Sequence, residues 1–259
     1  MEQPQPVPRL THTVTDGVAT VVISNPAKRN AMTAEMWGAL PALLGALAAD
    51  PAVRALVLTG DGPVFCAGAD ISSLGRPGAD GLLPQDLAVR AEEALAAFPR
   101  PTVAAVRGYC VGGGCQLAAA CDLRFAEEGA RFGVTPAKLG IVYPGSSTRR
   151  LVALTGPSAA KYLLFSGELI DTGRALRTGL VDEVLPAGEL DARVAAFTAV
   201  LVARSGLTQT AAKEFASGRR DRDEHWDRQA AGQGAPGGDT AEGIAAFLER
   251  RAPRFTWRG

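Results

Sequence analysis

Two short glycine-bearing segments constrain this chain more than any other feature. Residues 65–70 read FCAGAD, and residues 108–116 read GYCVGGGCQ. Each follows a strand-like run, and in each the backbone carries few side chains, so its N–H groups can face a ligand. Brought together, two such loops offer two N–H donors to one oxygen. That geometry stabilises a carbonyl oxygen that becomes negative during a reaction.

Length, charge and hydropathy restrict the class of protein. The 259 residues allow one large domain, or a core with an appendage, and a substantial buried core. The formal net charge is +0 and the basic residues are scattered, so we expect no nucleic-acid partner. No apolar run reaches membrane-spanning length, and no basic stretch precedes an apolar one at the N-terminus. We therefore expect no membrane association and a cytoplasmic enzyme.

The cysteines do not indicate a metal site. There are four: Cys66, Cys110, Cys115 and Cys121. None forms a Cys-x-x-Cys pair, and the two histidines lie near opposite ends of the chain, so we expect no zinc. Cys66 and Cys115 stand beside the glycine segments, and a thiol nucleophile is one alternative. We prefer packing as small hydrophobic side chains, because no histidine is close in sequence to activate them.

Hydrophobic spacing in the first half of the chain predicts an α/β core. Residues 11–23 alternate and predict paired strands. Thr33 is the expected N-cap of a helix that ends near Ala49, and Pro41 should bend this helix or move its start. Further strands are expected at 54–59, 101–106 and 121–126, and helices at 85–98 and 112–120. This alternation is typical of stacked α/β units.

The second half of the chain changes character after Gly145. Helices are expected at 148–154, 157–165, 172–177, 190–203 and 240–251, with one strand at 181–185. Residues 72–84 carry several glycines and prolines and should be irregular. Residues 217–239 are charged and then glycine-rich, so we expect a long loop there, with His225 exposed. A helical C-terminal third on an α/β core suggests subunit assembly.

Many blocks in the right order resemble the crotonase superfamily, the enoyl-CoA hydratase/isomerase group. The glycine run alone is not a dinucleotide fingerprint, because the third glycine of that motif would fall at Leu117. The resemblance runs from about Val18 to the C-terminus. Its blocks are NPxxxNA from Asn25, the two glycine segments, CDL from Cys121, Phe132-Gly133, Leu139-Gly140, residues 160–184 and FLERR from Phe247.

The resemblance implies a fold and an assembly. The fold is an α/β, crotonase-like spiral of ββα units with a helical C-terminal trimerisation region, assembled as a homotrimer or a dimer of trimers. We therefore expect an acyl-CoA-binding core over residues 1–200 and a helical oligomerisation region over residues 201–259. A coenzyme A thioester is expected as substrate, with no tightly bound cofactor and no metal.

Matching positions also imply site residues. The oxyanion donors would be the N–H groups of Ala69 and Gly113. The acyl-CoA would lie along Ala27, Lys28, Arg29, Ala67, Ala69, Asp70 and Ile71. Phe247 and Arg250 would approach the adenine end of a neighbouring subunit's CoA. Plain surface charge is the alternative for Lys28 and Arg29, and packing of the last helix is the alternative for Phe247.

Two positions depart from a hydratase. A hydratase of this family adds water with two glutamates, and the matching positions here hold Gln116 and Pro136. Neither side chain exchanges a proton at neutral pH, and acid–base catalysis contributes about 100- to 10,000-fold per group. We therefore expect little hydration. Loss of carbon dioxide from a carboxylate next to the thioester carbonyl forms the enolate without a base, so a decarboxylase-like lyase is favoured.

Residues 135–143 support that preference by resemblance. They look like the corresponding segment of methylmalonyl-CoA decarboxylase, a crotonase member that also lacks the glutamate pair. Thr135 and Tyr143 would hold the carboxylate or deliver a proton through water, and Gln116 would orient a water or the acyl group. That decarboxylase has a histidine where Ala69 stands, so another group must orient the carboxylate here. Packing alone is the alternative for Thr135, Tyr143 and Gln116.

Two other functions stay open. A non-catalytic acyl-CoA-binding protein would keep the fold without the chemistry. A double-bond isomerase needs one mobile carboxylate, which Glu92 or Glu93 would supply, although we expect both to be solvated on a polar helix face. Asp70 and Asp122 are interpreted as acceptors for local N–H groups rather than as bases.

Overall fold

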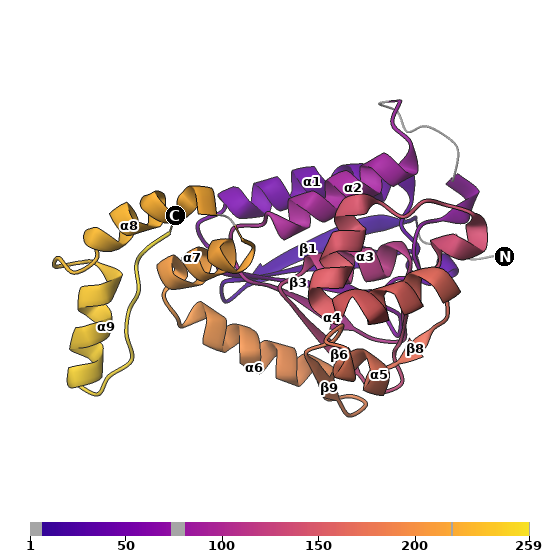
Figure 1. The fold of residues 1–259 in the computed structure, drawn as a ribbon. Helices are drawn as coiled ribbons and strands as arrows, with labels where there is room; N and C mark the ends of the chain where they lie inside the picture. Colours follow the sequence, from indigo (N-terminus) through magenta and orange to yellow (C-terminus); the bar gives the residue numbers. More distant parts are fainter. Residues whose placement is uncertain (1–6, 74–80, 219, 259) are drawn as a thin grey trace.

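A six-stranded sheet forms the centre of the computed structural model, which describes residues 7–73, 81–218 and 220–258 (Figure 1). The sheet order is β1-β2-β3-β4-β6-β9, and only the β1–β2 pair is antiparallel. Its strands are β1 (Arg9–Thr15), β2 (Val18–Ser24), β3 (Ala55–Gly60), β4 (Thr102–Val106), β6 (Leu123–Glu127) and β9 (Glu183–Leu185). The predicted α/β class and the expected paired strands are confirmed.

A second, smaller sheet was not predicted. In the described residues it has three strands in the order β5-β7-β8. They are β5 (Tyr109–Val111), β7 (Arg131–Gly133) and β8 (Ile170–Asp171). Two or three residues are too few to display an alternating pattern, so spacing alone could not find them. This sheet matters for the site, because β5 leads directly into the glycine run.

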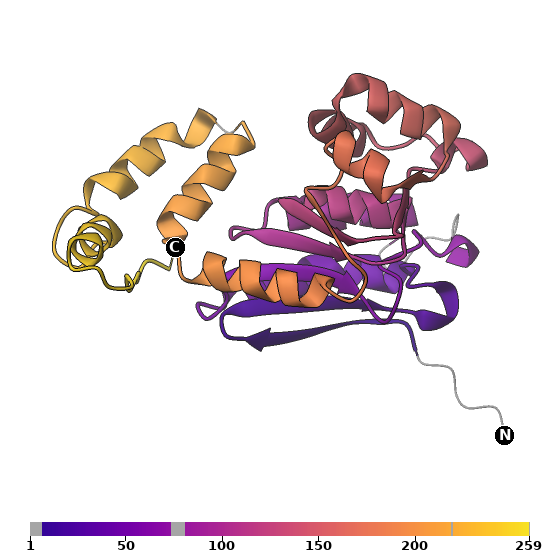
Figure 2. The same ribbon diagram turned by 90° about the horizontal axis from the view of Figure 1, so that it is seen from below.

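Helices cover both faces of the main sheet (Figure 2). Three of them, α1 (Ala34–Ala49), α2 (Pro84–Ala96) and α3 (Gly113–Ala120), bury the larger core against one face. On the other face α6 (Leu190–Val202) packs on a smaller cluster that includes Val103 and Phe125. With both faces covered, β4 is buried along its whole length, as expected of a parallel strand.

The first helix begins where the sequence predicts. The Thr33 hydroxyl accepts a hydrogen bond from the Met36 N–H at 3.3 Å, which caps the helix. Pro41 lies inside α1 and does not move its start, which remains at Ala34.

The C-terminal helices differ from the prediction at residues 145–166, 206–216 and 223–231. Helix α4 (Gly145–Ser166) joins two predicted helices across Gly156, and α5 (Thr172–Arg177) matches its prediction. Beyond them lie α7 (Gly206–Ala216), α8 (Asp223–Ala231) and α9 (Asp239–Leu248). The last two stand away from the sheet at one end of the molecule (Figure 1). Among the described residues, none of these helices has the length and apolar character needed to span a bilayer.

The prediction of a long loop over residues 217–239 is wrong, because this segment contains α8. This helix is strongly charged and has one buried anchor, Trp226, so it shows no repeating apolar pattern. The Trp226 indole N–H donates to the Glu214 carboxylate at 2.8 Å, and its ring lies 6.1 Å from that of Trp257. Contacts with α7 and the C-terminal segment thus support a helix that spacing could not reveal.

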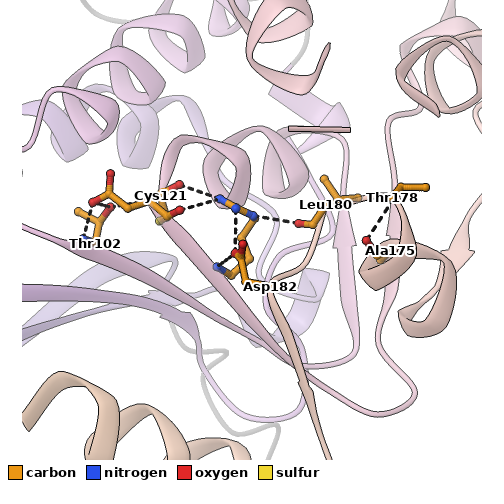
Figure 3. A network of polar contacts seen from close by, with 8 residues as sticks. Thr102, Cys121, Ala175, Thr178, Leu180 and Asp182 are labelled. Carbon is orange, nitrogen blue, oxygen red and sulfur yellow. Dashed lines mark hydrogen bonds and ion pairs between the residues drawn. The ribbon is translucent and has the colours of Figure 1, made fainter. Parts of the chain in front are cut away.

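A buried arginine fixes the far end of α3 to the sheet (Figure 3). Arg124 is 2% exposed, and its guanidinium donates to the Leu180 carbonyl at 2.9 Å and the Cys121 carbonyl at 2.8 Å. It also pairs with the Asp182 carboxylate at 2.8 Å, which accepts the Arg124 backbone N–H as well. These bonds tie the end of α3, the start of β6 and the turn before β9 into one unit.

Backbone pairing holds the first glycine segment, residues 65–70, on both sides. Isolated bridges pair Ala69 with Met32 and Cys66 with Cys110 of β5. Four backbone hydrogen bonds of 2.8–3.0 Å make up these two bridges. The segment is therefore positioned by main-chain contacts to two neighbours rather than by its own side chains.

Close approach of the two glycine segments requires glycine on the second one. A Cβ on Gly114 would lie 2.3 Å from the Cys66 carbonyl oxygen, and one on Gly113 would lie 2.8 Å from the Trp37 ring. Both distances are shorter than real Cβ contacts, so a side chain at Gly114 would force the segments apart and one at Gly113 would displace Trp37.

Replacing the buried arginine should destabilise the fold. We expect Arg124→Ala to lower the free energy of unfolding by about 3 kcal/mol, because two buried carbonyls and Asp182 lose their partner. Urea denaturation measures the change. Arg228→Ala is the control, since Arg228 makes an exposed 3.7 Å pair with Glu224 and should cost less than about 0.5 kcal/mol. Equal effects in the two variants would contradict the assigned role.

A methyl group at the loop contact should also be costly. Gly114→Ala should lower the free energy of unfolding by about 1–3 kcal/mol through overpacking against Cys66. Gly45→Ala in α1 is the matched helical control, with nothing within 4 Å of the added atom. That variant should be neutral or more stable by up to about 1 kcal/mol. A neutral Gly114→Ala in the same denaturation experiment would show that the two segments are not in close contact.

Candidate active site

Two backbone amides lie side by side where the glycine segments meet. A Cβ placed on Gly113 would be 3.5 Å from the Ala69 nitrogen, and one on Gly68 would be 3.6 Å from the Gly113 nitrogen. Neither amide has a hydrogen-bond acceptor within the described ranges. Gly113 is the first residue of α3, so its N–H also carries the partial positive charge of a helix N-terminus.

These amides border a cavity of about 160 Å³. The glycine segments and Trp37 form one part of its lining, and residues 135–144 form another. The lining residues are Trp37, Ala67, Gly68, Ala69, Ile71, Pro84, Gln85, Ala88, Gly112, Gly113, Gln116, Thr135, Pro136, Leu139, Ile141, Val142, Tyr143 and Pro144. In the part of the chain that the structure describes, no aspartate, glutamate or histidine lines this cavity.

The structure brings the predicted catalytic residues together. Ala69, Gly113, Gln116, Thr135 and Tyr143 all line the cavity. Of the predicted acyl-CoA contacts, Ala67 and Ile71 line it as well, whereas Ala27 lies in a short 3-10 turn outside it. Residues that are up to 76 positions apart in the sequence, Ala67 and Tyr143, therefore share one small space.

Tyr143 carries the one titratable hydroxyl of the cavity lining in the described ranges. Burial raises the pKa of the Tyr143 phenol well above its usual value. The phenol therefore keeps its proton at neutral and mildly alkaline pH. Its oxygen has no hydrogen-bond partner among the residues that the structure describes, so a bound molecule can use it as a donor.

The predicted basic residues near the cavity have partners within the chain. The Lys28 ammonium lies 2.7 Å from one Asp70 carboxylate oxygen and 3.0 Å from the Ser72 hydroxyl. Burial opposes ionisation of Asp70, but bonds from Lys28 and Ser72 lower the pKa of its carboxyl overall. Asp70 also accepts the Ser72 N–H at 3.0 Å, as a local acceptor should. The Arg29 guanidinium lies 5.3 Å from the centre of the Tyr109 ring.

Phe247 and Arg250 do not reach the cavity of their own chain. Phe247 lies at the end of α9 and Arg250 follows that helix, which stands away from α3 (Figure 1). Phe247 is 84% exposed, so helix packing within the chain does not account for it.

Glu92 corrects an expectation and is the residue that sequence reasoning missed. Its side chain is fully buried rather than solvated, and the Gln116 amide nitrogen donates to it at 2.7 Å. Glu93, in contrast, has a half-exposed side chain. Spacing carried a signal, because Ala88, Ala91 and Leu95 lie on the same helix face as Glu92 and are all buried.

The cysteines are buried and free. Burial raises the pKa of the Cys66 and Cys121 thiols to about 12, so both stay protonated near neutral pH. This supports packing rather than nucleophilic attack. Asp122 accepts the Thr102 N–H at 2.8 Å, in agreement with its expected structural role.

Comparison with known proteins agrees with the fold. Residues 13–258 match the family model described as Enoyl-CoA hydratase/isomerase. A protein from Thermus thermophilus, provisionally named an enoyl-CoA hydratase, is 39% identical over 253 residues, covering 92% of this chain and 97% of its own length. The 2,3-dehydroadipyl-CoA hydratase of Escherichia coli is 33% identical over 250 residues, covering 93% and 96%.

A solved structure extends this agreement to three dimensions. The crystal structure of an enoyl-CoA hydratase/isomerase family member has a TM-score of 0.89 and 41% sequence identity, covering 98% of this chain and 100% of that one. Sequence, fold and the meeting of the two glycine segments therefore agree. The chain belongs to the enoyl-CoA hydratase/isomerase family, within the crotonase superfamily.

Proposed function

We propose that this chain binds an acyl-CoA thioester in the cavity and stabilises its enolate. The observation that carries the proposal is the pair of unpaired N–H groups, at Ala69 and Gly113, side by side at the cavity lining. Two donors at one thioester oxygen would stabilise the negative charge that develops there. The family supports an acyl-CoA ligand, since its relatives are named for enoyl-CoA substrates.

The reaction we propose needs no general base. The named relatives are hydratases, but Gln116 and Pro136 stand where a hydratase would carry its two glutamates, and no carboxylate lines the cavity in the described ranges. In a decarboxylation, the bond between the α-carbon and its carboxylate breaks. The electron pair delocalises onto the thioester oxygen, and carbon dioxide leaves. The Tyr143 hydroxyl, directly or through water, then gives a proton to the α-carbon and recovers one from solvent.

The proposal extends to CoA binding and assembly. Ala27, Lys28 and Arg29 would follow the nucleotide and pantetheine, with Lys28 exchanging its contact to Asp70 for the ligand. Exposure of Phe247 and Leu248 on α9 supports an assembly in which another subunit covers them. A homotrimer or a dimer of trimers would place Phe247 and Arg250 near a neighbour's CoA.

Offering two substrates separately tests the reaction type. We expect conversion of methylmalonyl-CoA to propionyl-CoA, and hydration of crotonyl-CoA slower by about 100-fold or more, because acid–base groups are missing. Liquid chromatography with mass spectrometry identifies both products. Fast hydration would show that an acid and a base have been overlooked. Tight binding of both thioesters without any product would favour the non-catalytic alternative.

Removing the phenol tests the proton donor. Tyr143→Phe should lower kcat by about 100-fold or more while KM stays nearly unchanged. Because the pKa of Tyr143 is raised, kcat of the parent enzyme should not fall as the pH rises toward about 10, the usual tyrosine pKa. Tyr162→Phe is the control, since Tyr162 bonds Glu168 outside the cavity. An unchanged kcat in Tyr143→Phe would remove Tyr143 from the mechanism.

A further inference from the structure

A buried carboxylate lies directly behind one residue of the cavity. Glu92 of α2 is 0% exposed and does not line the cavity itself. One of its oxygens, Oε2, accepts hydrogen bonds from Gln116 of α3 at 2.7 Å and from the Ser147 hydroxyl of α4 at 2.5 Å. Arg150, one helical turn after Ser147, forms an ion pair with it. Three helices thus meet at one charged group that the proposed mechanism does not use.

This carboxylate dictates which way the Gln116 amide faces. An ionised carboxylate only accepts hydrogen bonds, so the amide nitrogen and not the amide oxygen must point to Glu92. The same nitrogen lies 3.2 Å from the Ser147 oxygen, which is next to the Glu92 oxygen in this cluster. The amide nitrogen therefore faces Glu92 and Ser147, and the reversed amide would put two acceptors against each other.

The amide oxygen of Gln116 remains for the cavity. It accepts no hydrogen bond from the described residues, yet it is not fully buried. Within the described ranges, the Trp37 indole nitrogen is the one buried side-chain polar atom without a hydrogen-bond partner. The unbonded amide oxygen of Gln116 is therefore accessible rather than buried. Because Gln116 lines the cavity, its oxygen offers a hydrogen-bond acceptor there.

The geometry points to Glu92 as a positioning residue of the active site. Held by Arg150 and Ser147, it locks the Gln116 amide so that position 116 presents its amide oxygen, an acceptor, to the reacting end of the acyl group. The site therefore selects a hydrogen-bond donor at that point, such as an ordered water or a hydroxyl. This inference deepens the proposed function and rests on it for the substrate used below.

Glu92 also excludes a second carboxylate at position 116. A glutamate there would place two carboxylates about as close as the present 2.7 Å contact, and like charges so close cannot both ionise. The negative charge of the region stays on Glu92 and is balanced by Arg150. Glu92 and Gln116 thus act as one unit.

A measurement on the free protein tests the locked amide independently of any substrate. With 15N-labelled glutamine, the side-chain NH2 signals of Gln116 are assigned by their loss in Gln116→Ala. We expect slow proton exchange for this NH2 in the parent protein, and exchange faster by about 10-fold or more in Glu92→Gln, whose amide can face either way. Glu93→Gln is the matched control. Glu93 is the next residue and also contacts Arg150, at 3.2 Å, but makes no contact with Gln116.

Kinetics test the consequence for the reaction. With methylmalonyl-CoA, Glu92→Gln should lower kcat by about 10- to 100-fold with little change in KM, because the acceptor is misplaced rather than lost. Gln116→Ala should lower it at least as much, and the double variant no further. Glu93→Gln should match the parent. Additive losses in the double variant would overturn the coupling.

The exchange measurement and the kinetics together distinguish failure of this inference from failure of the proposed function. Unchanged NH2 exchange in Glu92→Gln, with the protein folded by circular dichroism, overturns this inference whatever the reaction is. Faster exchange in a protein that decarboxylates nothing supports the locked amide and contradicts the proposed function alone. If Glu92→Gln does not fold, Ser147→Ala removes one of the two amide partners and should still accelerate exchange. No acceleration in that variant would overturn the inference.

Discussion

The main-chain pairing of residues 65–70 is the interaction on which the site depends. One side of this segment is hydrogen-bonded to Met32 and the other to β5, so most of its backbone N–H and C=O groups have partners within the fold. The Ala69 amide is the one left over at the point of contact with Gly113. Because backbone bonds hold both segments, the donors need no rearrangement when charge develops, which is the condition for effective electrostatic stabilisation.

Neutralisation of nearby carboxylates is consistent with the proposed role of these donors. Asp70 lies beside the segment but is paired with Lys28, and Glu92 lies behind the cavity but is paired with Arg150. An unpaired negative charge at either position would oppose an enolate, since Coulomb repulsion is strong away from bulk water. With both carboxylates paired, the helix N-terminus at Gly113 is the main positive feature that a thioester oxygen would meet.

How much of this could be predicted depends on whether a feature is local. The Thr33 cap, the strands of the α/β core and the role of glycine in residues 108–116 follow from local patterns, and the structure agrees with them. The short strand β5 and the helix α8 depend on distant partners, such as the contact of Trp226 with Glu214, which no window of sequence contains. The candidate site falls between these cases. Its residues could be named from the sequence, but their shared cavity required the fold.

The position of one negative charge separates the chemistry proposed here from hydration. A carboxylate at position 116 would touch the cavity and could exchange protons with a bound water. Here the carboxylate belongs to Glu92, which lies behind Gln116, is fully buried and pairs with Arg150, so it cannot contact a substrate. It can still act through the amide that it orients. In the proposed function, a site built this way would hold an enolate and orient a donor beside it, and it would obtain that enolate by a step that needs no base.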